Sequence, residues 1–412
     1  MKPRPLAADQ VLCLTLARQG LAARLRDADP VAAVERFGPL HATDRSTPYL
    51  SLLARIETFR FEDLDRAWLV DRTLDRRSAM RGTFHLVPRA RAHTIVCVVG
   101  IPDPANVRYL RLAGVEPALA KRVRRAVEDV IAKNGPTDVA GLKRALPEPF
   151  RAEAMAKTKG GGSVLAAVLR WMAEAGILAG AARRDRKTGA VQGGWIHAPL
   201  VFERFDDAFG KGVPCRQPEA DAALASWYFQ AHGPAAFEDW AWWNGLPAAR
   251  SRAAFERAQG DLEEVTVEGW PALFVPKGAL DQSESPRDRA QDGPTVRLVP
   301  YEEAAIKAYR ATRQRFFDPA HAERSHTLFG EVLPTILVDG RVAGTWSSGA
   351  GGWSNALVAA SGKTDRSLSA ELFGRADRAV KRALDGEVDR VRAAFAAASR
   401  DLNRVDAPAG DG

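Results

Sequence analysis

The sequence predicts an α+β protein built from three successive units, each with helices followed by a two-stranded hairpin, and a C-terminal α+β region. Two observations support this class. Segments with apolar residues at helical spacing alternate with short β-type segments, and the order helix, strand, turn, strand occurs three times. The chain has 412 residues, of which 46% are hydrophobic, so it can bury several cores.

The first predicted unit covers residues 1–112 and carries the most helical signals. Leu12 and Leu16 recur near helical spacing, and acidic residues stand in the first turn of a later helix, where the helix dipole favours them. The expected elements are helices over 8–25, 50–56 and 62–70, a turn-rich stretch over 37–44, and a strand over 79–87 that Pro88 ends.

The second and third predicted units, 113–215 and 216–293, repeat the pattern. In the second, a helix begins at Ser163 and ends near Gly176, which is typical of a helix C-terminus. The expected elements that follow are strands over 177–182 and 191–198 joined by a loop, then a helix over 250–259, strands over 263–267 and 270–275, and an exposed linker over 277–293.

The C-terminal region, 294–412, predicts a different arrangement. Asp339-Gly340 is a favoured hairpin turn and separates expected strands over 332–338 and 341–347. A long charged helix is expected over 367–398, and the last eight or so residues should be disordered.

Helices followed by a two-stranded wing describe the winged helix, a variant of the helix-turn-helix. The alternative is a set of unrelated α+β domains, because no repeat is visible at the level of single residues. A net charge of +8 favours a polyanionic partner without naming it.

The second expected wing concentrates the positive charge. Residues 151–190 hold eight Lys or Arg against three acids, which gives +5 of the chain's +8. A charge run is usually a solvated face, but this one occupies a loop before a helix and a wing tip, both places where winged helices touch DNA. Gly160–Gly162 would let backbone N–H groups reach a phosphate. The predicted DNA-binding residues here are Lys157, Lys159, Arg183, Arg184, Arg186 and Lys187.

The cysteines and the hydropathy of the sequence indicate the cellular compartment and whether a structural metal site is expected. Cys13, Cys97 and Cys215 are far apart and lack metal-ligand spacing, which argues against a disulfide framework and a structural zinc site. We find no apolar run long enough to span a bilayer and no signal peptide at the N-terminus. We therefore expect a cytoplasmic, nucleoid-associated protein that has no metal or other cofactor and no membrane partner.

Several blocks of residues resemble the winged-helix DNA glycosylases of the AlkZ and YcaQ type, along nearly the whole chain. The resemblance implies three tandem winged helices around a concave DNA channel, a β-rich C-terminal region, and removal of alkylated purines. The blocks are MRGTFHLV at 80–87, HGPA at 232–235, FEDWAWW at 237–243, RLVP at 297–300 and VDGRVAGTW at 338–346.

The chain departs from this family at its catalytic motif. Family members carry Gln-aliphatic-Gln or Gln-aliphatic-Asp shortly after the first helix, and the aligned residues here are His41-Ala42-Thr43. The family's Asp after its Leu-Leu-Pro block is replaced by Glu303. Fold and DNA binding are therefore implied more firmly than catalysis.

His41, Thr43 and Asp44 are the candidate catalytic residues. Neutral imidazole has one free lone pair, so His41 can accept a proton from an attacking water, and Thr43 can fix that water by a hydrogen bond. If the segment is extended, both side chains point the same way. Asp44 is the reserve candidate for an anionic role. The alternative is that His41 and Thr43 are loop residues and Asp44 caps the next helix.

Arg81 and His85 are the remaining candidates for DNA contact. Alternation along the expected strand places Arg81, Thr83 and His85 on one face, with Arg81 on a phosphate and His85 near the lesion; the alternative is a surface strand with a satisfied histidine. Trp240, Trp242 and Trp243 invite a base-stacking role, but their helical spacing favours core packing.

The sequence thus predicts a monomeric, monofunctional glycosylase that acts on N7-alkylguanine or related cationic adducts in double-stranded DNA, bulky genotoxin adducts included. Water would be the nucleophile, because no lysine lies near His41 in the sequence. Two rival hypotheses remain. One is a non-catalytic winged-helix DNA-binding protein or regulator, and the other is a glycosylase for a different lesion.

Overall fold

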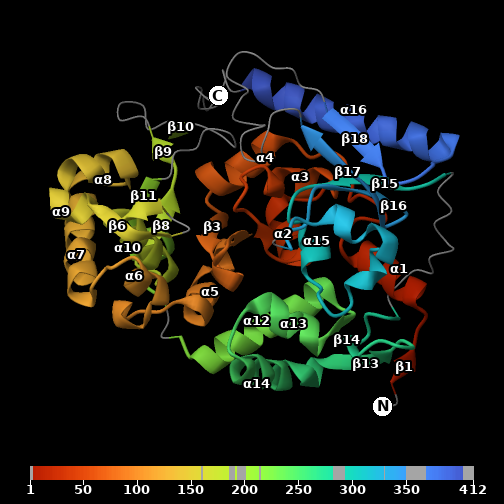
Figure 1. The fold of residues 1–412 in the computed structure, drawn as a ribbon, viewed down its shortest axis with the longest axis horizontal. Helices are drawn as coiled ribbons and strands as arrows, with labels where there is room; N and C mark the ends of the chain where they lie inside the picture. Colours follow the sequence, from red (N-terminus) through yellow and green to blue (C-terminus); the bar gives the residue numbers. More distant parts are fainter. Residues whose placement is uncertain are drawn as a thin grey trace, which may run out of the picture.

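The computed structural model describes residues 3–158, 161–184, 191–192, 201–212, 215–281, 293–328, 330–348 and 368–401. Helices and sheets alternate along these residues, which confirms the predicted α+β class (Figure 1). The second unit lies at one side of the molecule, and the long C-terminal helix borders the first unit (Figure 1).

The first unit contains shorter elements than its sequence predicts. Helix α1 ends at Arg18 rather than near residue 25, because Gly20 adopts φ +65°, and a side chain at this position would clash with the Phe37 ring. The elements are α1 (Ala8–Arg18), α2 (Pro30–Phe37), β2 (Leu40–His41), α3 (Thr47–Leu53), α4 (Phe61–Asp65) continuing as a π-helical turn (Arg66–Val70), β3 (Leu74–Ser78) and β4 (Phe84–Pro88).

The strand predicted over 79–87 is wrong in its first half. Residues Met80–Gly82 form a 3-10 turn between β3 and β4, and Arg81 has φ 57°. The sheet has the order β2-β4-β3. The sequence did not indicate strand β3, because this segment is rich in charged residues. In the structure, Asp75 and Arg77 form an ion pair with each other, and both side chains are buried. Arg81 and Thr83 therefore do not share a strand face with His85.

The second unit packs α7 (Pro117–Asn134) against α10 (Val164–Glu174). The helix predicted to begin at Ser163 is confirmed, and Ser163 caps it by accepting a hydrogen bond from the Ala166 amide. β8 (Leu178–Ala181) pairs with β11 (Val201–Arg204), whose other edge pairs with β5 (Thr137–Asp138). The strand predicted over 191–198 is described only as β10 (Val191–Gln192), which pairs with β9 (Arg183–Arg184); residues 193–200 lie outside the described part.

The other elements between β4 and α12 are α5 (Ala92–Val99), α6 (Arg108–Leu112), α8 (Val139–Ala145), α9 (Glu148–Arg151), β6 (Glu153–Thr158), β7 (Gly161–Ser163) and α11 (Phe205–Phe209). Leu110 of α6 and Leu142 of α8 belong to the core of the second unit.

The third unit is helical on one side and has a four-stranded sheet on the other. Its helices are α12 (Gln217–His232), α13 (Phe237–Asn244) and α14 (Ala248–Ala258), and its sheet has the order β1 (Arg4–Pro5), β13 (Leu262–Thr266), β14 (Leu273–Pro276), β12 (Ala235–Ala236). The N-terminal strand β1 thus pairs in parallel with β13. Of the linker predicted over 277–293, residues 282–292 lie outside the described part.

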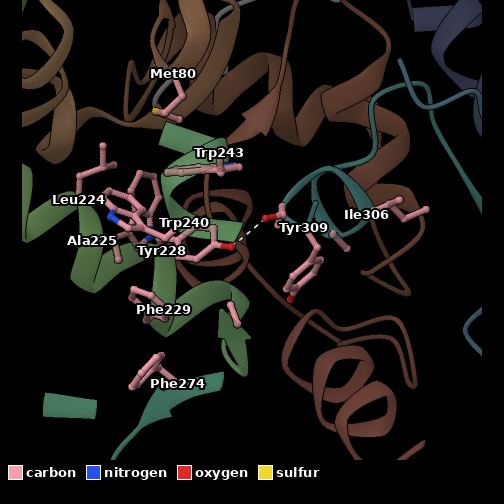
Figure 2. Close-up of a cluster of buried hydrophobic side chains, with 14 of the residues drawn as sticks. Met80, Leu224, Ala225, Tyr228, Phe229, Trp240, Trp243, Phe274, Ile306 and Tyr309 are labelled. Atoms are coloured by element: carbon pink, nitrogen blue, oxygen red, sulfur yellow. Dashed lines mark hydrogen bonds between the residues drawn. The ribbon is translucent and has the colours of Figure 1, made fainter. Parts of the chain in front are cut away.

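An aromatic cluster fills the core of the third unit (Figure 2). Trp240 is 0% and Trp243 6% exposed, which confirms the predicted core packing for these two residues. The Tyr228 hydroxyl donates to the Ala308 carbonyl at 2.8 Å, so this core also binds the C-terminal region (Figure 2). Trp242 is only partly buried.

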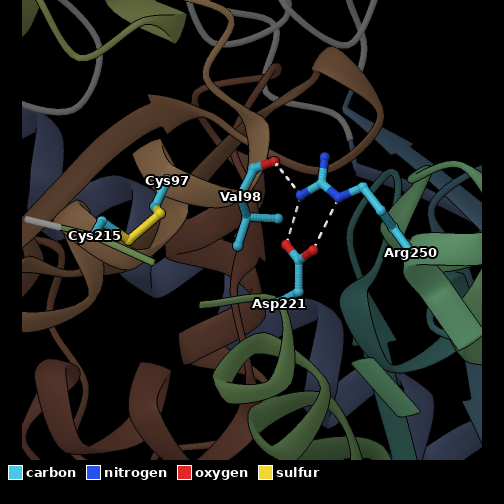
Figure 3. The surroundings of a disulfide bond; sticks show 5 residues. All are labelled: Cys97, Val98, Cys215, Asp221 and Arg250. Atoms are coloured by element: carbon cyan, nitrogen blue, oxygen red, sulfur yellow. Dashed lines mark hydrogen bonds and ion pairs between the residues drawn. A yellow bond between two sulfur atoms is a disulfide. The ribbon is translucent and has the colours of Figure 1, made fainter. Parts of the chain in front are cut away.

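Cys97 in α5 and Cys215 before α12 form a disulfide with Cα atoms 6.1 Å apart (Figure 3). The expectation drawn from cysteine spacing is wrong here, because folding packs α5 on α12 and brings together residues that are 118 positions apart. Beside the disulfide, Arg250 donates to Asp221 at 2.6 and 2.9 Å and to the Val98 carbonyl at 3.0 Å (Figure 3).

The C-terminal sheet has the order β15 (Val296–Val299), β16 (Thr335–Val338), β17 (Arg341–Ser348), β18 (Leu368–Leu372). The predicted hairpin is confirmed, with Asp339 and Gly340 at φ 48° and 82° in its turn. The helix predicted over 367–398 is wrong at its start, because β18 precedes α16 (Arg378–Asp401). The predicted disordered tail, 402–412, lies outside the described residues.

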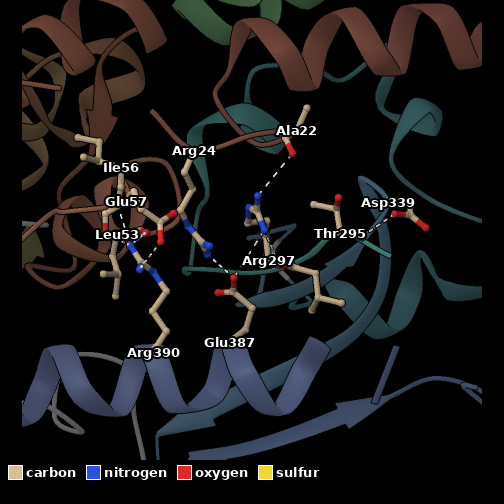
Figure 4. Close-up of polar contacts among 11 residues, drawn as sticks. Ala22, Arg24, Leu53, Ile56, Glu57, Thr295, Arg297, Asp339, Glu387 and Arg390 are labelled. Carbon is tan, nitrogen blue, oxygen red and sulfur yellow. Dashed lines mark hydrogen bonds and ion pairs between the residues drawn. The ribbon is translucent and has the colours of Figure 1, made fainter. Parts of the chain in front are cut away.

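Arginines attach α16 to the first unit (Figure 4). Glu387 forms ion pairs with Arg24 and with Arg297, and Arg390 donates to the Ile56 and Glu57 carbonyls at 2.7 and 2.8 Å. None of the helices in the described part of the chain combines the length and apolar character needed to cross a membrane.

Candidate active site

His41 and His85 lie opposite each other on paired strands. Ala42 donates its amide to the Phe84 carbonyl at 2.7 Å, which sets β2 against β4 and aligns His41 with His85. His41 and His85 therefore form a non-hydrogen-bonded pair, the kind of antiparallel pair in which the two opposite side chains approach closely. The ring centroids are 5.6 Å apart with an edge-on orientation of 84°, and each side chain is 7% exposed.

Thr43 follows strand β2, two residues after its end. The Ala42 carbonyl accepts from Arg76 Nε at 2.8 Å instead of continuing the ladder, and Thr43 Oγ1 accepts the Phe84 amide at 3.2 Å in its place. Thr43 is exposed. A hydroxyl that accepts one bond keeps its own proton and a second lone pair, so Thr43 retains hydrogen-bonding capacity toward solvent.

Asp44 stabilises the start of α3. Its Oδ1 accepts the Ser46 amide at 2.8 Å and the Ser46 hydroxyl at 2.6 Å, and the residue is 7% exposed. Burial raises the pKa of Asp44, while the bonds from Ser46 and the charge of Arg76 oppose that rise. The N-cap of α3 is Ser46, without a side-chain capping bond, so the capping alternative for Asp44 is wrong in detail: Asp44 bonds the residue at the cap rather than the helix amides, and Ser46 fixes the direction of the carboxylate.

His85 is held as a neutral imidazole. Its Nδ1 lies 3.1 Å from the Thr83 carbonyl, a partner that can only accept, so Nδ1 carries the proton and Nε2 the lone pair. Burial lowers the pKa of His85 to about 4, against the bond to Thr83. His85 therefore adds no positive charge beside His41 near neutral pH.

The C-terminal region brings Tyr301 to the same place. The Tyr301 ring lies edge-on to His41, with centroids 6.3 Å apart, and its carbonyl accepts from Thr47 Oγ1 at 3.0 Å. Sequence reasoning missed this contact, although Tyr301 directly follows the RLVP block. Glu303, in contrast, is fully buried in an ion pair with Arg55 and accepts from Ser51 Oγ at 3.0 Å.

Arg81 lies where the first unit meets the third. Its guanidinium stacks 4.5 Å from the Trp242 ring and donates to the Trp242 carbonyl at 3.0 Å, while the residue remains exposed. Burial of part of the side chain lowers the pKa of Arg81, Glu302 opposes this, and Arg310 adds to it. The charges of Glu302 and Arg310, both in the C-terminal region, therefore act on Arg81.

The basic wing is described in part. Arg183 and Arg184 are exposed on β9, and Arg183 forms an ion pair with Asp138 at 3.2 Å. Lys157 belongs to strand β6, which pairs with β7 in a different sheet from β9. Lys159, Arg186 and Lys187 lie outside the described residues. Among the residues that are described, no three His, Cys, Asp or Glu side chains are grouped to hold a metal ion.

Comparisons with known proteins agree with one another. Residues 34–404 match the model of a family described as DNA glycosylase AlkZ-like. The Streptomyces sahachiroi DNA glycosylase AlkZ has a similar structure, with a TM-score of 0.70 over 95% of this chain and 97% of that one, at 20% sequence identity. No curated protein matched the chain.

Proposed function

The chain belongs to the AlkZ-like DNA glycosylase family, and on this premise we propose that it is a monofunctional glycosylase that removes alkylated purines from double-stranded DNA. We further propose that its three units are tandem winged helices around a concave DNA channel, and that the protein works as a monomer in the cytoplasm, associated with the nucleoid. N7-alkylguanine and bulky genotoxin adducts are the proposed substrates.

The observation that carries this proposal is the placement of His41. His41, which the resemblance aligns with the family's catalytic motif, is an imidazole held by the pairing of β2 with β4, beside a neutral histidine and two residues before the exposed Thr43. A cationic alkylpurine is already a good leaving group, so the enzyme has only to place a water and stabilise an oxocarbenium-like sugar.

In the proposed reaction, the water oxygen bonds to the sugar C1′ as the glycosidic bond breaks. The bonding electron pair leaves with the purine and neutralises its positive charge. His41 accepts the proton that the water loses, and Thr43 holds the water by a hydrogen bond. Asp44 is the reserve candidate for the anionic role, because its direction is set by Ser46.

DNA binding is proposed to use the basic wing and the first unit. Arg183 and Arg184 present exposed charge on β9, and Arg81 is exposed beside Trp242. Lys157, Lys159, Arg186 and Lys187 are the other proposed phosphate contacts, and His85 is proposed to lie near the lesion.

The test is base release from duplexes that carry N7-methylguanine or a bulkier N7 adduct. Free base and alkali-revealed strand breaks should appear faster than spontaneous depurination, without added cofactor and in the presence of EDTA. His41→Ala combined with Thr43→Ala should abolish most of this release, and His93→Gln, on α5 against Phe205, is the control. Retained DNA binding without release from any adduct would instead favour the non-catalytic regulator.

A further inference from the structure

His41 is held between two rings that come from different parts of the chain. His85 on β4 approaches edge-on from one strand, at 5.6 Å and 84°, and Tyr301 approaches edge-on from the C-terminal region, at 6.3 Å and 73°. Edge-on contacts are favourable aromatic arrangements and restrict ring rotation. The orientation of the candidate base therefore depends on a residue outside its own unit.

Tyr301 is itself anchored at both ends. Its backbone carbonyl accepts from Thr47 Oγ1 at 3.0 Å, and its phenol donates to the Glu331 carboxylate. Glu331 is fixed in turn, because its Oε2 accepts from Thr327 Oγ1 at 3.2 Å and its carbonyl accepts the Thr327 amide at 2.9 Å. Burial, the bond to Glu331 and the surrounding carboxylates raise the pKa of Tyr301, so the side chain stays a neutral phenol.

Glu331 has a second effect, through its charge. On the strands beside His41, His85 is neutral, and Arg76 interacts with the charges of Asp44 and Arg45. The C-terminal region contributes two carboxylates. Glu302 forms an ion pair with Lys307 at 2.8 Å, and Glu331 accepts the hydrogen bond from the Tyr301 phenol. Glu331 thus brings negative charge to the tyrosine that touches His41, where an imidazolium forms if His41 accepts a proton.

We propose that Tyr301, anchored by Glu331, is a positioning residue that orients the His41 imidazole and brings a stabilising negative charge to it. The catalytic consequence of this inference rests on the proposed function. The contact between Tyr301 and His41 does not depend on it. Tyr301 transfers no proton in this scheme. It fixes the direction of the His41 lone pair, and a general base displaced by about 1 Å can lose roughly 100-fold in rate.

The experiment compares Tyr301→Ala, Tyr301→Phe and Glu331→Gln in the full-length protein, with two readouts. The first is single-turnover base release together with DNA affinity. Tyr301→Ala should release base roughly 10- to 100-fold more slowly at unchanged DNA affinity, and Tyr301→Phe should keep most of the rate because it keeps the ring. Tyr109→Ala is the matched control, since its hydroxyl also donates to a carboxylate, Glu174, at 2.8 Å but on α6.

The second readout is NMR of the histidine rings, assigned with His41→Gln, and it needs no activity. Tyr301→Ala should move the His41 ring signals, and Tyr301→Phe should not. Glu331→Gln should lower the His41 titration midpoint by roughly 0.3–0.5 pH unit, the size of one carboxylate at partly screened distance.

The two readouts separate the two hypotheses. Unchanged His41 signals in Tyr301→Ala and an unchanged midpoint in Glu331→Gln would overturn the positioning role, whatever the enzyme activity. Absence of base release in the wild type would instead defeat the proposed function, while shifted His41 signals would still establish that Tyr301 orients His41.

Discussion

Arg55 and Glu303 form an ion pair in which both side chains are entirely excluded from solvent. Glu303 Oε1 also accepts the Ala305 amide at 3.0 Å, and Arg55 Nη1 donates to the Ser51 carbonyl at 2.9 Å. The pair joins α3 to the C-terminal region that carries Tyr301. The pair therefore has a structural role: it holds together two segments that flank the candidate site.

Glu303→Ala should destabilise the protein strongly, because it leaves the Arg55 charge buried without its carboxylate. Loss of one partner of a buried pair typically costs about 3–5 kcal/mol. The free energy of unfolding in urea measures this loss. Asp389→Ala, which breaks an exposed pair with Arg392 on α16, is the control and should cost under about 1 kcal/mol. Equal effects of the two variants would show that burial does not set the value of the Arg55 pair.

Acid should destabilise the fold through two buried histidines. Burial, with repulsion from Arg55, Arg18 and Arg315, lowers the pKa of His232 to about 3, and burial lowers the pKa of His85 to about 4. Both stay neutral in the folded protein while the unfolded chain takes up protons below about pH 6.5. Stability is therefore full above that pH and falls on acidification toward the two folded pKa values.

The expected loss is about 1.4 kcal/mol per pH unit for each histidine between pH 6 and pH 4. Urea unfolding at several pH values measures how steeply the free energy of unfolding falls with pH. His85→Gln should reduce this slope by the contribution of one histidine, about 1.4 kcal/mol per pH unit. A free energy of unfolding that stays constant from pH 7 to pH 5 would contradict this account.

The basic wing should set the salt dependence of DNA binding. Neutralising Arg183, Arg184, Arg186 and Lys187 together should weaken binding to every sequence. It should also flatten the log–log salt slope by roughly 0.9 for each phosphate that the protein no longer neutralises. Fluorescence anisotropy over a salt series measures the slope. Neutralising Arg375, Arg378, Lys381 and Arg382 near α16 removes the same charge elsewhere, and an equal flattening there would place the DNA-binding surface outside the wing.

Reduction of the Cys97–Cys215 disulfide should destabilise the protein. The bond spans 118 positions, and closing a loop of that length stabilises by about 2–5 kcal/mol, mainly by restricting the unfolded chain. Cys97→Ser with Cys215→Ser should show this loss in oxidising buffer, and dithiothreitol should then have no further effect. Cys13→Ser is the control, since Cys13 is a free thiol. Unchanged stability of the wild type under reduction would contradict this expectation.

Features set by local chemistry could be predicted from the sequence. The Asp339-Gly340 turn requires φ above zero at two adjacent positions, which these residue types tolerate, and the hairpin follows. The helix that begins at Ser163 was predicted from its apolar pattern, and Ser163 caps it. The position of His41 beside His85 was not predicted as a pair, but both residues were identified as candidates.

Features set by tertiary contacts could not be predicted. The charged sequence of β3 forms a strand because Arg76 stacks on Phe84 at 4.2 Å and Asp75 pairs with Arg77. The disulfide and the contact of Tyr301 with His41 join residues that are far apart in the chain. Residue spacing along the sequence predicts only local structure, so it cannot predict such contacts. Glu303 was noted only as a replacement, and its burial with Arg55 gives it a structural role.

The pH profile of single-turnover base release in wild type and His41→Gln tests the central claim most directly. A base must be neutral, so the wild-type rate should fall on acidification through the pKa of His41. His41→Gln should show a flat profile, His41→Ala should lose about 100-fold, and Thr43→Ala less, all at unchanged DNA affinity. A fall near neutral pH cannot come from His85, because burial lowers the pKa of His85 to about 4. Identical profiles for wild type and His41→Gln, or full activity in His41→Ala, would contradict the account and leave Asp44 as the next candidate.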